Sequence, residues 1–414
     1  MIRKNVWLIG LLILALCFAS CGKTVVVKAE ELSGNYQRTA TETGAVTEAF
    51  REAFSSFSFR LLDESVTGGN KCLSPLSAYL CLSLIANGAE GETKQEMEKA
   101  LGLSVDDLNL ALYAYTDGLK SEQDSKLELA NSVWFRNSNT ALQVRETFLQ
   151  TLADWYQAEA FGAPFDETTR QDLDNWVSKH TDGMIQKMLD KPIGANTMMY
   201  LVNALVFDAK WELQYENSNV RDWEFTGASG AKKTVKGLFS TESIYFEAAG
   251  VKGFAKPYKN ENYYFVGLIP ADGQKSASDL AAELSGERWL SLWENRSYER
   301  VNAMIPEFKT EDKTELNEIL KSLGMEKMFT DNAEFLPMAS YNGESLYVSE
   351  VVQKTFLELD RNGTKAAAVT WGEMNTKSAA PMIMKEVFLD RPFVYMIVDG
   401  TSGLPVMLGV IESL

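Results

Sequence analysis

The stretch Gly363-Thr-Lys-Ala-Ala-Ala-Val-Thr370 opens a segment of more than 20 residues between two strand-like runs. These runs, Tyr347–Leu359 and Val387–Val398, have the β-branched and aromatic composition of buried strands. A connection of that length without structure of its own is uncommon inside a compact domain, and it is usually functional or disordered. The segment that begins at Gly363 is therefore the first candidate for a functional site.

A period of two runs through this segment, as it does in a β-strand. One face would carry small or uncharged side chains, namely Thr364, Ala366, Ala368, Thr370, Gly372 and Met374. The other face would carry Lys365, Trp371 and Glu373. Such a segment can enter a sheet as a strand with its small face inward. Composition alone favours the simpler alternative, an Ala-rich flexible loop.

The rest of the chain has helices early and strands late. One amphipathic helix is indicated by four apolar residues at helical spacing: Phe50, Phe54, Phe57 and Leu61. A second apolar stretch begins after Ser74-Pro75 and continues to Leu84. From Asn196 onward strand-like runs dominate, among them Tyr263–Ile269, Val301–Ile305 and Phe393–Val398. Without strict alternation of the two types, this order predicts an α+β fold with large sheets rather than a doubly wound fold.

Composition restricts the possible partners. The chain has 414 residues and is 45% hydrophobic, enough for a large core in one big domain or two ordinary ones. Its net charge of -17 argues against nucleic acid as a partner. A negative field can favour encounter with basic partners, but an acidic soluble surface with no such role is the simpler interpretation.

Cysteine and histidine usage argues against an enzyme and against a metal site. His180 is the only histidine, so a Ser-His-Asp or Cys-His enzyme would depend on it, and a solvated surface position is the expectation. No HExxH, P-loop or GxGxxG pattern occurs. If the stretch from Cys72 to Cys81 is largely helical, about 13 Å separates the two thiols, beyond disulfide reach. We expect buried free thiols and no cofactor.

The N-terminus has the pattern of a targeting signal. Arg3 and Lys4 precede an apolar run, Val6–Phe18, which is short for a membrane span. The run ends at Cys21 after small residues, like the bacterial lipobox whose cysteine is acylated; an ordinary cleavage site with an incidental cysteine is the alternative. We expect a signal peptide over 1–20, a lipid anchor at Cys21 in the bacterial cell envelope, on its periplasmic face or at the surface, and a polar tether over 21–45.

Several motifs in the chain, taken in their order, resemble those of the serpin family over residues 46–414. They are Asn70-Lys-Cys-Leu-Ser74-Pro75-Leu-Ser77, Gly88-Ala89 with Gly91-Glu92-Thr93, Asn175-Trp176-Val177 with Thr181-Asp182-Gly183-Met184-Ile185, Asn203-Ala204 through Lys210-Trp211, Gly363 to Thr370, and Val387 to Ile397, with Gly409 in the closing strand. Each motif is moderately specific alone, and their order and spacing carry the resemblance.

The resemblance implies a serpin fold and a suicide inhibitor of serine or cysteine proteases. Such an inhibitor is a monomer, is not an enzyme and needs no cofactor. Its hinge would be Gly363, Thr364, Ala366, Ala367 and Ala368, and its reactive loop would extend over about 363–386. A protease would cleave the loop and form an acyl-enzyme, and the freed hinge would insert into the main sheet. The resemblance assigns the region where the sheet opens to Ser74, Ser77, Asn203, Trp211 and Gln353.

The same resemblance predicts the bond that the protease attacks. The attacked carbonyl usually follows the hinge glycine by about fourteen residues, which predicts cleavage between Lys377 and Ser378 and a trypsin-like target. The longer downstream stretch also offers Thr376, Met382 or Met384 as alternative positions, which would suit elastase-like or cysteine proteases.

This chain departs from the family pattern at four positions. Val369 stands where alanine is usual, on the face that would point outward. Arg361 and Lys365 stand where inhibitory members commonly have Glu, and Gln353 stands where many have histidine. A non-inhibitory serpin that acts as a binding module, and an unrelated substrate-binding lipoprotein, remain as alternatives.

Overall fold

The computed structural model describes residues 26–137, 141–248, 250–273, 275–364 and 384–414. Its helices are α1 (Glu48–Ser65), α2 (Pro75–Ala86), α3 (Gly91–Leu101), α4 (Val105–Gly118), α5 (Glu146–Thr151), α6 (Glu167–His180), α7 (Ala277–Glu283), α8 (Gly286–Glu294) and α9 (Asn317–Ser322). The predicted helices are confirmed as α1 and α2. Ser74 caps α2 through its side chain, Pro75 occupies the first turn, and every residue of α2 is buried.

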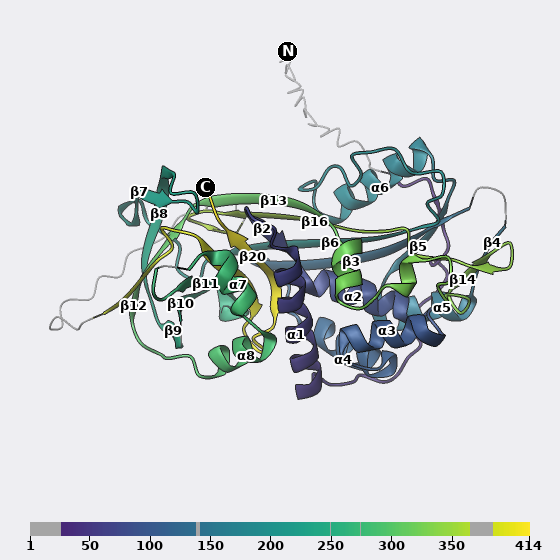
Figure 1. The fold of residues 1–414 in the computed structure, drawn as a ribbon, viewed down its shortest axis with the longest axis horizontal. Coiled ribbons are helices and arrows are strands. Elements are labelled where there is room, and N and C mark those ends of the chain that lie inside the picture. Colours follow the sequence, from purple (N-terminus) through teal and green to yellow (C-terminus); the bar gives the residue numbers. More distant parts are fainter. Residues whose placement is uncertain (1–25, 138–140, 249, 274, 365–383) are drawn as a thin grey trace, which may run out of the picture.

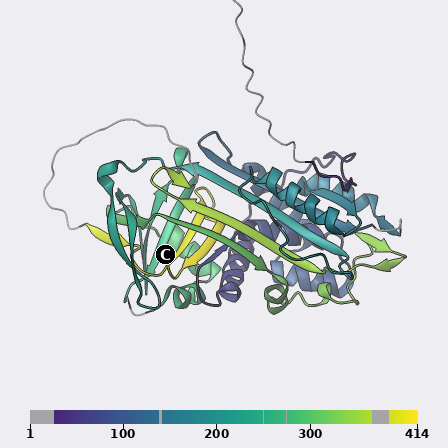
Figure 2. The same cartoon turned by 90° about the horizontal axis from the view of Figure 1, so that it is seen from above.

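The largest sheet has seven strands in the order β1-β5-β3-β6-β17-β16-β13. Their bounds are β1 (Glu30–Glu31), β5 (Glu159–Ala163), β3 (Ser125–Arg136), β6 (Met199–Lys210), β17 (Gly363–Thr364), β16 (Glu350–Leu359) and β13 (Phe308–Glu315). The sheet runs along the long axis of the molecule, with α6 on one side and α2 to α4 on the other (Figure 1). Figure 2, seen from above, shows α6 as the teal helix on top of these strands.

The remaining strands form three smaller sheets. A six-stranded sheet has the order β2-β20-β19-β11-β10-β9, with β2 (Lys71–Leu73), β20 (Pro405–Ile411), β19 (Phe393–Asp399), β11 (Tyr263–Pro270), β10 (Val251–Pro257) and β9 (Ile244–Ala248). A four-stranded sheet has the order β18-β12-β8-β7, with β18 (Lys385–Phe388), β12 (Val301–Pro306), β8 (Lys232–Glu242) and β7 (Val220–Thr226). The third joins β15 (Glu344–Ser345), β14 (Ala339–Tyr341) and β4 (Leu142–Val144). The prediction of α+β architecture is therefore confirmed.

Strand β6 divides the interior into two cores. Its odd-numbered residues, among them Leu201, Leu205 and Phe207, join the main core with α1 and α2. Its even-numbered residues Tyr200 and Val202 join a second, smaller core under α6. Because side chains alternate across a strand, a strand buried on both faces needs apolar residues at nearly every position. This requirement explains why every residue of Met199–Phe207 except Asn203 is apolar or aromatic.

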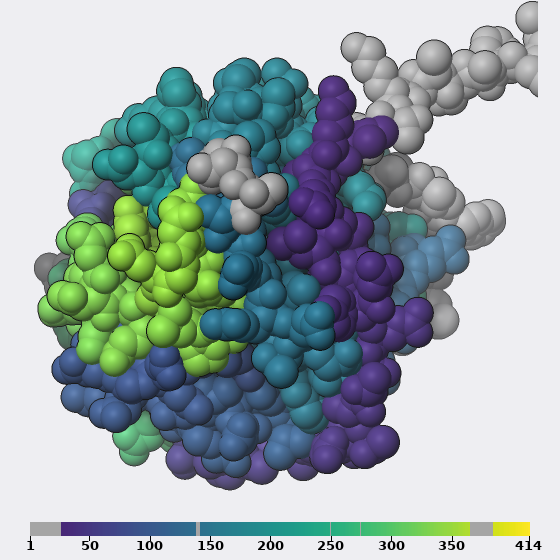
Figure 3. All heavy atoms as spheres, turned by 90° about the vertical axis from the view of Figure 1, so that its right-hand side faces the viewer, coloured from purple at the N-terminus to yellow at the C-terminus, as the bar shows by residue number. Residues whose placement is uncertain are grey.

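The N-terminal segment corrects the prediction of a tether over 21–45, because residues 26–45 lie against the domain (Figure 3). Strand β1 pairs antiparallel with β5 at the edge of the main sheet, and the backbone N–H of Leu32 donates to the carbonyl of Ala160 at 2.7 Å. Further along, the guanidinium of Arg38 stacks on the ring of Tyr113 at 3.5 Å. Polar composition did not reveal this docking, because the partners of the segment, such as Asp154 and Asp172, lie more than 100 positions away in the sequence.

A single carboxylate fixes the end of this segment. Asp154 accepts hydrogen bonds from the backbone N–H groups of Thr39 at 2.6 Å and Ala40 at 3.0 Å, and from the side chain of Gln150. Burial raises its pKa, but these hydrogen bonds outweigh the effect and hold the pKa of Asp154 below its ordinary value. The carboxylate therefore stays charged at neutral pH and keeps its N–H partners.

Two further predictions concern single side chains. Cys72 and Cys81 are buried free thiols, as predicted, and burial raises their pKa values to about 11 and about 12. The prediction of a solvated His180 is wrong. Its ring is half-buried and packs on Trp176 at 4.3 Å between centroids, because the last turn of α6 lies back against β5. Its Nε2 atom lies 3.9 Å from the carboxylate of Glu159.

Candidate functional site at the opening of the main sheet

The two hinge residues that the structure describes are already part of the main sheet. Gly363 and Thr364 form β17, which pairs antiparallel with β6 at Lys210 and Ala209 and with β16 at Leu359. Toward the N-terminal end of β6, the two strands pair directly, with Tyr200–Asn203 of β6 against Glu350–Gln353 of β16. Between the two contacts, residues 204–208 of β6 have no strand partner on the β16 side within the described chain. Among the described residues, the pairing of β6 with β16 is therefore interrupted next to Thr364; this interruption is called the opening, with Thr364 at its upper end and Gln353 at its lower end. The predicted residues Ala366, Ala367, Ala368, Lys377 and Ser378 lie outside the described residues.

Thr364 is buried, and its hydroxyl forms a hydrogen bond with that of Tyr258. Its side chain is 1% exposed, and its hydroxyl lies 2.6 Å from the hydroxyl of Tyr258. Burial raises the pKa of Tyr258 far above its ordinary value, so the phenol stays protonated and can donate. Beside it, a Cβ on Gly363 would stand 2.0 Å from the carbonyl oxygen of Ala209. Only glycine lets the hinge backbone approach β6 this closely.

Trp211 fixes the turn that leads into the hinge. Its indole N–H donates to the carbonyl of Asp360 at 2.9 Å, and its ring stacks on Tyr258 at 4.4 Å between centroids. The backbone N–H of Trp211 donates to the backbone carbonyl of Asn362 at 2.9 Å. The Asp360 carboxylate in turn accepts from the backbone N–H groups of Asn362 and Gly363, at 2.7 and 3.2 Å. The backbone and the side chain of Trp211 therefore both hold the turn Asp360–Asn362, which leads into the hinge.

Gln353 lies at the point where β6 and β16 separate, and it is 3% exposed. Its amide nitrogen donates to the carbonyl of Ser74 at 2.8 Å, and its amide oxygen accepts from the N–H of Ser74 at 2.9 Å. One side chain thus satisfies both backbone groups at the N-cap of α2. The hydroxyl of Ser74 donates to the carbonyl of Val406 and caps Ser77, so β16, α2 and β20 meet here.

Other buried polar side chains surround the same point. Asn203 donates to Asn131 on β3 at 2.5 Å, and Thr355 donates to the carbonyl of Cys72 at 2.7 Å. The Oγ atom of Ser77 is buried and has no hydrogen-bond partner among the described atoms. Where the two central strands part, the interior therefore contains hydrogen-bonded polar groups in place of apolar packing.

The structure brings most of the predicted site residues together in two groups. Thr364, Gly363 and Trp211 lie at the upper end of the opening, and Ser74, Ser77, Asn203 and Gln353 lie at its lower end. Sequence reasoning missed Tyr258, Asn131 and Thr355, whose roles depend on contacts across elements. It also missed an ion pair beneath Trp211, between the nearly inaccessible Lys256 and Glu242 at 2.9 Å. The signal for it in the sequence is Lys256, a charged residue that follows the apolar pair Phe254-Ala255 in β10.

Within the described residues, no group of three or more His, Cys, Asp or Glu side chains is arranged to hold a metal ion. In the same part of the chain, no helix is long and apolar enough to cross a membrane.

Comparison with known proteins agrees with this geometry. A family model described as "Serpin (serine protease inhibitor)" matches residues 52–414, so the chain belongs to the serpin family. The crystal structure of the thermophilic serpin tengpin in its native state is similar with a TM-score of 0.89 and 39% identity, over 94% of this chain and 100% of that one. The latent state of tengpin is similar with a TM-score of 0.78 and 38% identity, over 89% and 99%.

A curated relative carries the resemblance to inhibitors. Leukocyte elastase inhibitor from Equus caballus is 29% identical over 371 residues, covering 86% of this chain and 96% of the relative. Serpins are in general protease inhibitors rather than catalysts, and these relatives support an inhibitory function in general for this chain.

The geometry at Gln353 predicts a large loss of stability on truncation. Gln353→Ala leaves the buried N–H of Ser74 without a partner and removes one of the two hydrogen bonds to the Ser74 carbonyl, which still accepts from the N–H of Ala78; the expected cost is about 1–3 kcal/mol. The midpoint of thermal unfolding should fall by several degrees. Gln171→Ala, which truncates an exposed glutamine on α6, serves as the matched control and should leave the midpoint unchanged. Equal midpoints for the two variants would show that the Gln353 contacts do not stabilise the native sheet.

Proposed function

We propose that this serpin traps proteases by inserting its cleaved reactive loop into the main sheet. The observation that carries the proposal is the opening between β6 and β16, with Thr364 already seated at its upper end. The next residues of the chain need only continue the strand that β17 begins. Backbone groups of residues 204–208 would gain partners on the β16 side, so each inserted residue adds hydrogen bonds and burial.

The register of β17 supports insertion of the predicted small face inward. Extending the pairing Thr364–Ala209 downward would bring Ala366 opposite Phe207, Ala368 opposite Leu205 and Thr370 opposite Asn203. The facing residues Phe207 and Leu205 belong to the main core, where small side chains fit against large ones. A bulky or charged inward residue would be typical of a serpin that does not inhibit, and the inward face carries none.

The same register suggests why this chain has Lys365 where many inhibitory serpins have glutamate. Extension of β17 by one residue would bring Lys365 between Asp208 of β6 and Glu358 of β16. A lysine is attracted by two flanking carboxylates, whereas a glutamate would be repelled. We infer that the reversed charge suits this particular sheet and does not oppose insertion.

The chemical step that starts insertion belongs to the protease. Its nucleophile forms a bond to the carbonyl carbon of Lys377, the bond to the nitrogen of Ser378 breaks, and that nitrogen takes up a proton as the new N-terminus. Extended chain rises about 3.3 Å per residue. The ten residues from Lys365 to Met374 therefore match the ten β6 residues from Asp208 up to Met199, and Lys377 would reach the far end of the strand. A lysine at this position suits a trypsin-like protease, and an elastase-like or cysteine protease is the alternative.

Insertion predicts a strong effect at Thr364. Thr364→Arg would bury an unpaired charge beside Tyr258, so insertion of the loop should become slower than hydrolysis of the acyl-enzyme. The variant should act mainly as a substrate, with several inhibitor molecules consumed per protease molecule and little complex that survives SDS. The control is Thr234→Arg, at an exposed position of β8, which should trap as well as the wild type. Full trapping by Thr364→Arg would exclude the insertion mechanism.

The scissile bond is tested by the fragment that inhibition releases. During trypsin inhibition, mass spectrometry should find a C-terminal fragment that begins at Ser378, and Lys377→Ala should lose most of its rate against trypsin. A fragment that begins at Ile383 or later, together with trapping retained in Lys377→Ala, would move the reactive bond downstream.

We further propose that Cys21 carries the lipid that holds the protein in the bacterial cell envelope. The apolar run Val6–Phe18 followed by small residues and Cys21 supports this proposal. Cys21→Ser should move the protein from the membrane fraction to the soluble fraction, while protease trapping stays unchanged. Retention of the variant in membranes would exclude anchorage through Cys21.

A further inference from the structure

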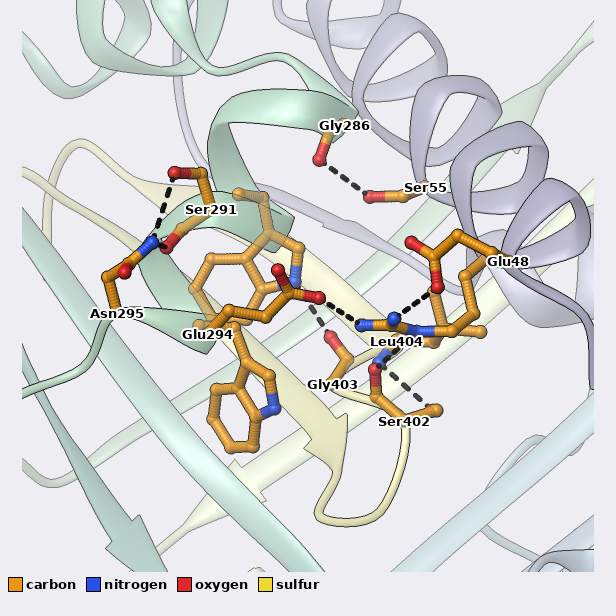
Figure 4. Close-up of polar contacts among 12 residues, drawn as sticks. Glu48, Ser55, Gly286, Ser291, Glu294, Asn295, Ser402, Gly403 and Leu404 are labelled. Carbon is orange, nitrogen blue, oxygen red and sulfur yellow. Dashed lines mark hydrogen bonds and ion pairs between the residues drawn. The ribbon is translucent and has the colours of Figure 1, made fainter.

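A buried ion pair lies beneath the turn that leads into the hinge. Lys256 comes from β10 and Glu242 from the end of β8, and the Nζ atom of Lys256 lies 2.9 Å from the Oε1 atom of Glu242. Their side chains are only 3% and 7% exposed. Where α1 meets α8, by contrast, the two carboxylates that pair with Arg51, those of Glu48 and Glu294, are more than half exposed (Figure 4).

Stability alone is a weak reason for a buried ion pair. Removing two charges from water is costly, and their mutual attraction recovers this cost only when the geometry is favourable. Replacement of such a pair by apolar residues of similar volume often leaves the stability of a protein unchanged or raises it. The reason for Lys256 and Glu242 is therefore to be found in the groups that the two charges contact.

The ammonium of Lys256 faces two aromatic rings. Its Nζ atom lies 4.5 Å from the centre of the Tyr215 ring and 5.4 Å from the centre of a Trp211 ring. The two rings meet edge to face, with 6.3 Å between their centres. A cation within roughly 6 Å of the centre of an aromatic ring is attracted by the face of that ring, most strongly away from water. Lys256 therefore attracts both rings toward one point, and the carboxylate of Glu242 fixes that point.

Both rings belong to residues that hold the hinge turn. The backbone N–H of Tyr215 donates to the carbonyl of Arg361 at 3.0 Å. The backbone N–H and the indole N–H of Trp211 donate to the carbonyls of Asn362 and Asp360, both at 2.9 Å. All three carbonyls of the turn are therefore held by the two residues whose rings face the ammonium. Strand β17 follows this turn directly, so the turn fixes where the strand begins between β6 and β16.

The carboxylate of Glu242 connects this arrangement to a second sheet. In the four-stranded sheet Glu242 pairs with Val301 of β12, and Val301 pairs in turn with Lys385 of β18. The hinge turn joins β16 to β17 of the main sheet, and Lys256 belongs to the six-stranded sheet. The ion pair thus lies where three sheets meet. Because a charge-assisted hydrogen bond has a preferred length and direction, the ammonium cannot shift beneath the two rings as an apolar side chain can.

We propose that Lys256, fixed by Glu242, is a positioning residue for protease trapping, which holds Trp211 and Tyr215 so that the hinge turn is already ordered when the loop is cleaved. This inference rests on the proposed inhibitory function. Insertion then starts from a strand that is already in place, so the turn does not have to be ordered while the acyl-enzyme can still be hydrolysed. Without the ammonium the turn would be held less closely, and more inhibitor molecules would be consumed as substrates.

The double variant Lys256→Met/Glu242→Leu tests this role. It replaces both charges by apolar side chains of similar volume, so its unfolding midpoint should equal or exceed that of the wild type. Against trypsin it should consume about three times as many inhibitor molecules per trapped protease as the wild type does. In hydrogen exchange, the backbone N–H groups of Trp211 and Tyr215 should exchange about tenfold faster, because their acceptors in the turn are less ordered.

The control is Lys236→Met/Asp222→Asn, which removes an exposed ion pair between β8 and β7. It should match the wild type in inhibitor consumption and in hydrogen exchange. If the first double variant does not fold, Glu242→Asp takes its place. The shorter carboxylate should draw the ammonium away from the two rings, so both quantities should rise by a smaller factor.

Wild-type values of both quantities in the folded variant would overturn the proposal. A change in only one of them would also overturn it, because the proposal requires that a less ordered turn be the cause of poorer trapping. Failure of the wild type to form a complex with trypsin or elastase that survives SDS would instead contradict the proposed inhibition. Hydrogen exchange needs no protease, so the two failures are distinguishable.

Discussion

The pairing of β6 with β16 is incomplete, and the other features of the native fold depend on this gap. Backbone groups in the middle of a sheet are normally paired on both sides, because an unpaired central edge loses hydrogen bonds and invites another strand. Here the central strand β6 is paired with β3 along its length, yet residues 204–208 have no partner toward β16 in the described chain. Among the described residues, β6 therefore has room for one more strand beside it, which is what the proposed insertion requires.

Both ends of the gap are closed by polar contacts rather than by apolar packing. At the upper end, Tyr258 and Trp211 hold Thr364 and the turn at Asp360; at the lower end, Gln353 holds Ser74. The energy of a hydrogen bond depends steeply on distance and angle, whereas apolar contacts tolerate small shifts of the packed side chains. The proposed insertion would have to break these few hydrogen bonds, so the side chains that hold the native sheet together are also the ones that insertion would rearrange.

The sequence predicted the parts of this site that follow a local pattern. The period of two after Gly363 anticipated the inward position of Thr364, and apolar spacing anticipated α1 and α2, because side-chain direction is set within one element. Tyr258 and the docking of residues 26–45 were not predictable, since each depends on partners far away in the chain. The prediction for His180 was wrong for a related reason. The polarity of its own helix suggested a solvated side chain, but Trp176 and Glu159 of the neighbouring strand β5 cover part of its ring.

Docking of the N-terminal segment has a consequence for reach. The described chain begins at Val26, whose carbonyl accepts a hydrogen bond from the side chain of Asn175 of α6, and Cys21 lies five residues before it in the sequence. Five residues span at most about 18 Å when fully extended. With a lipid at Cys21, as proposed, the domain would be held within about that distance of the bilayer surface. Its targets would then be proteases that act at the membrane rather than in the surrounding fluid.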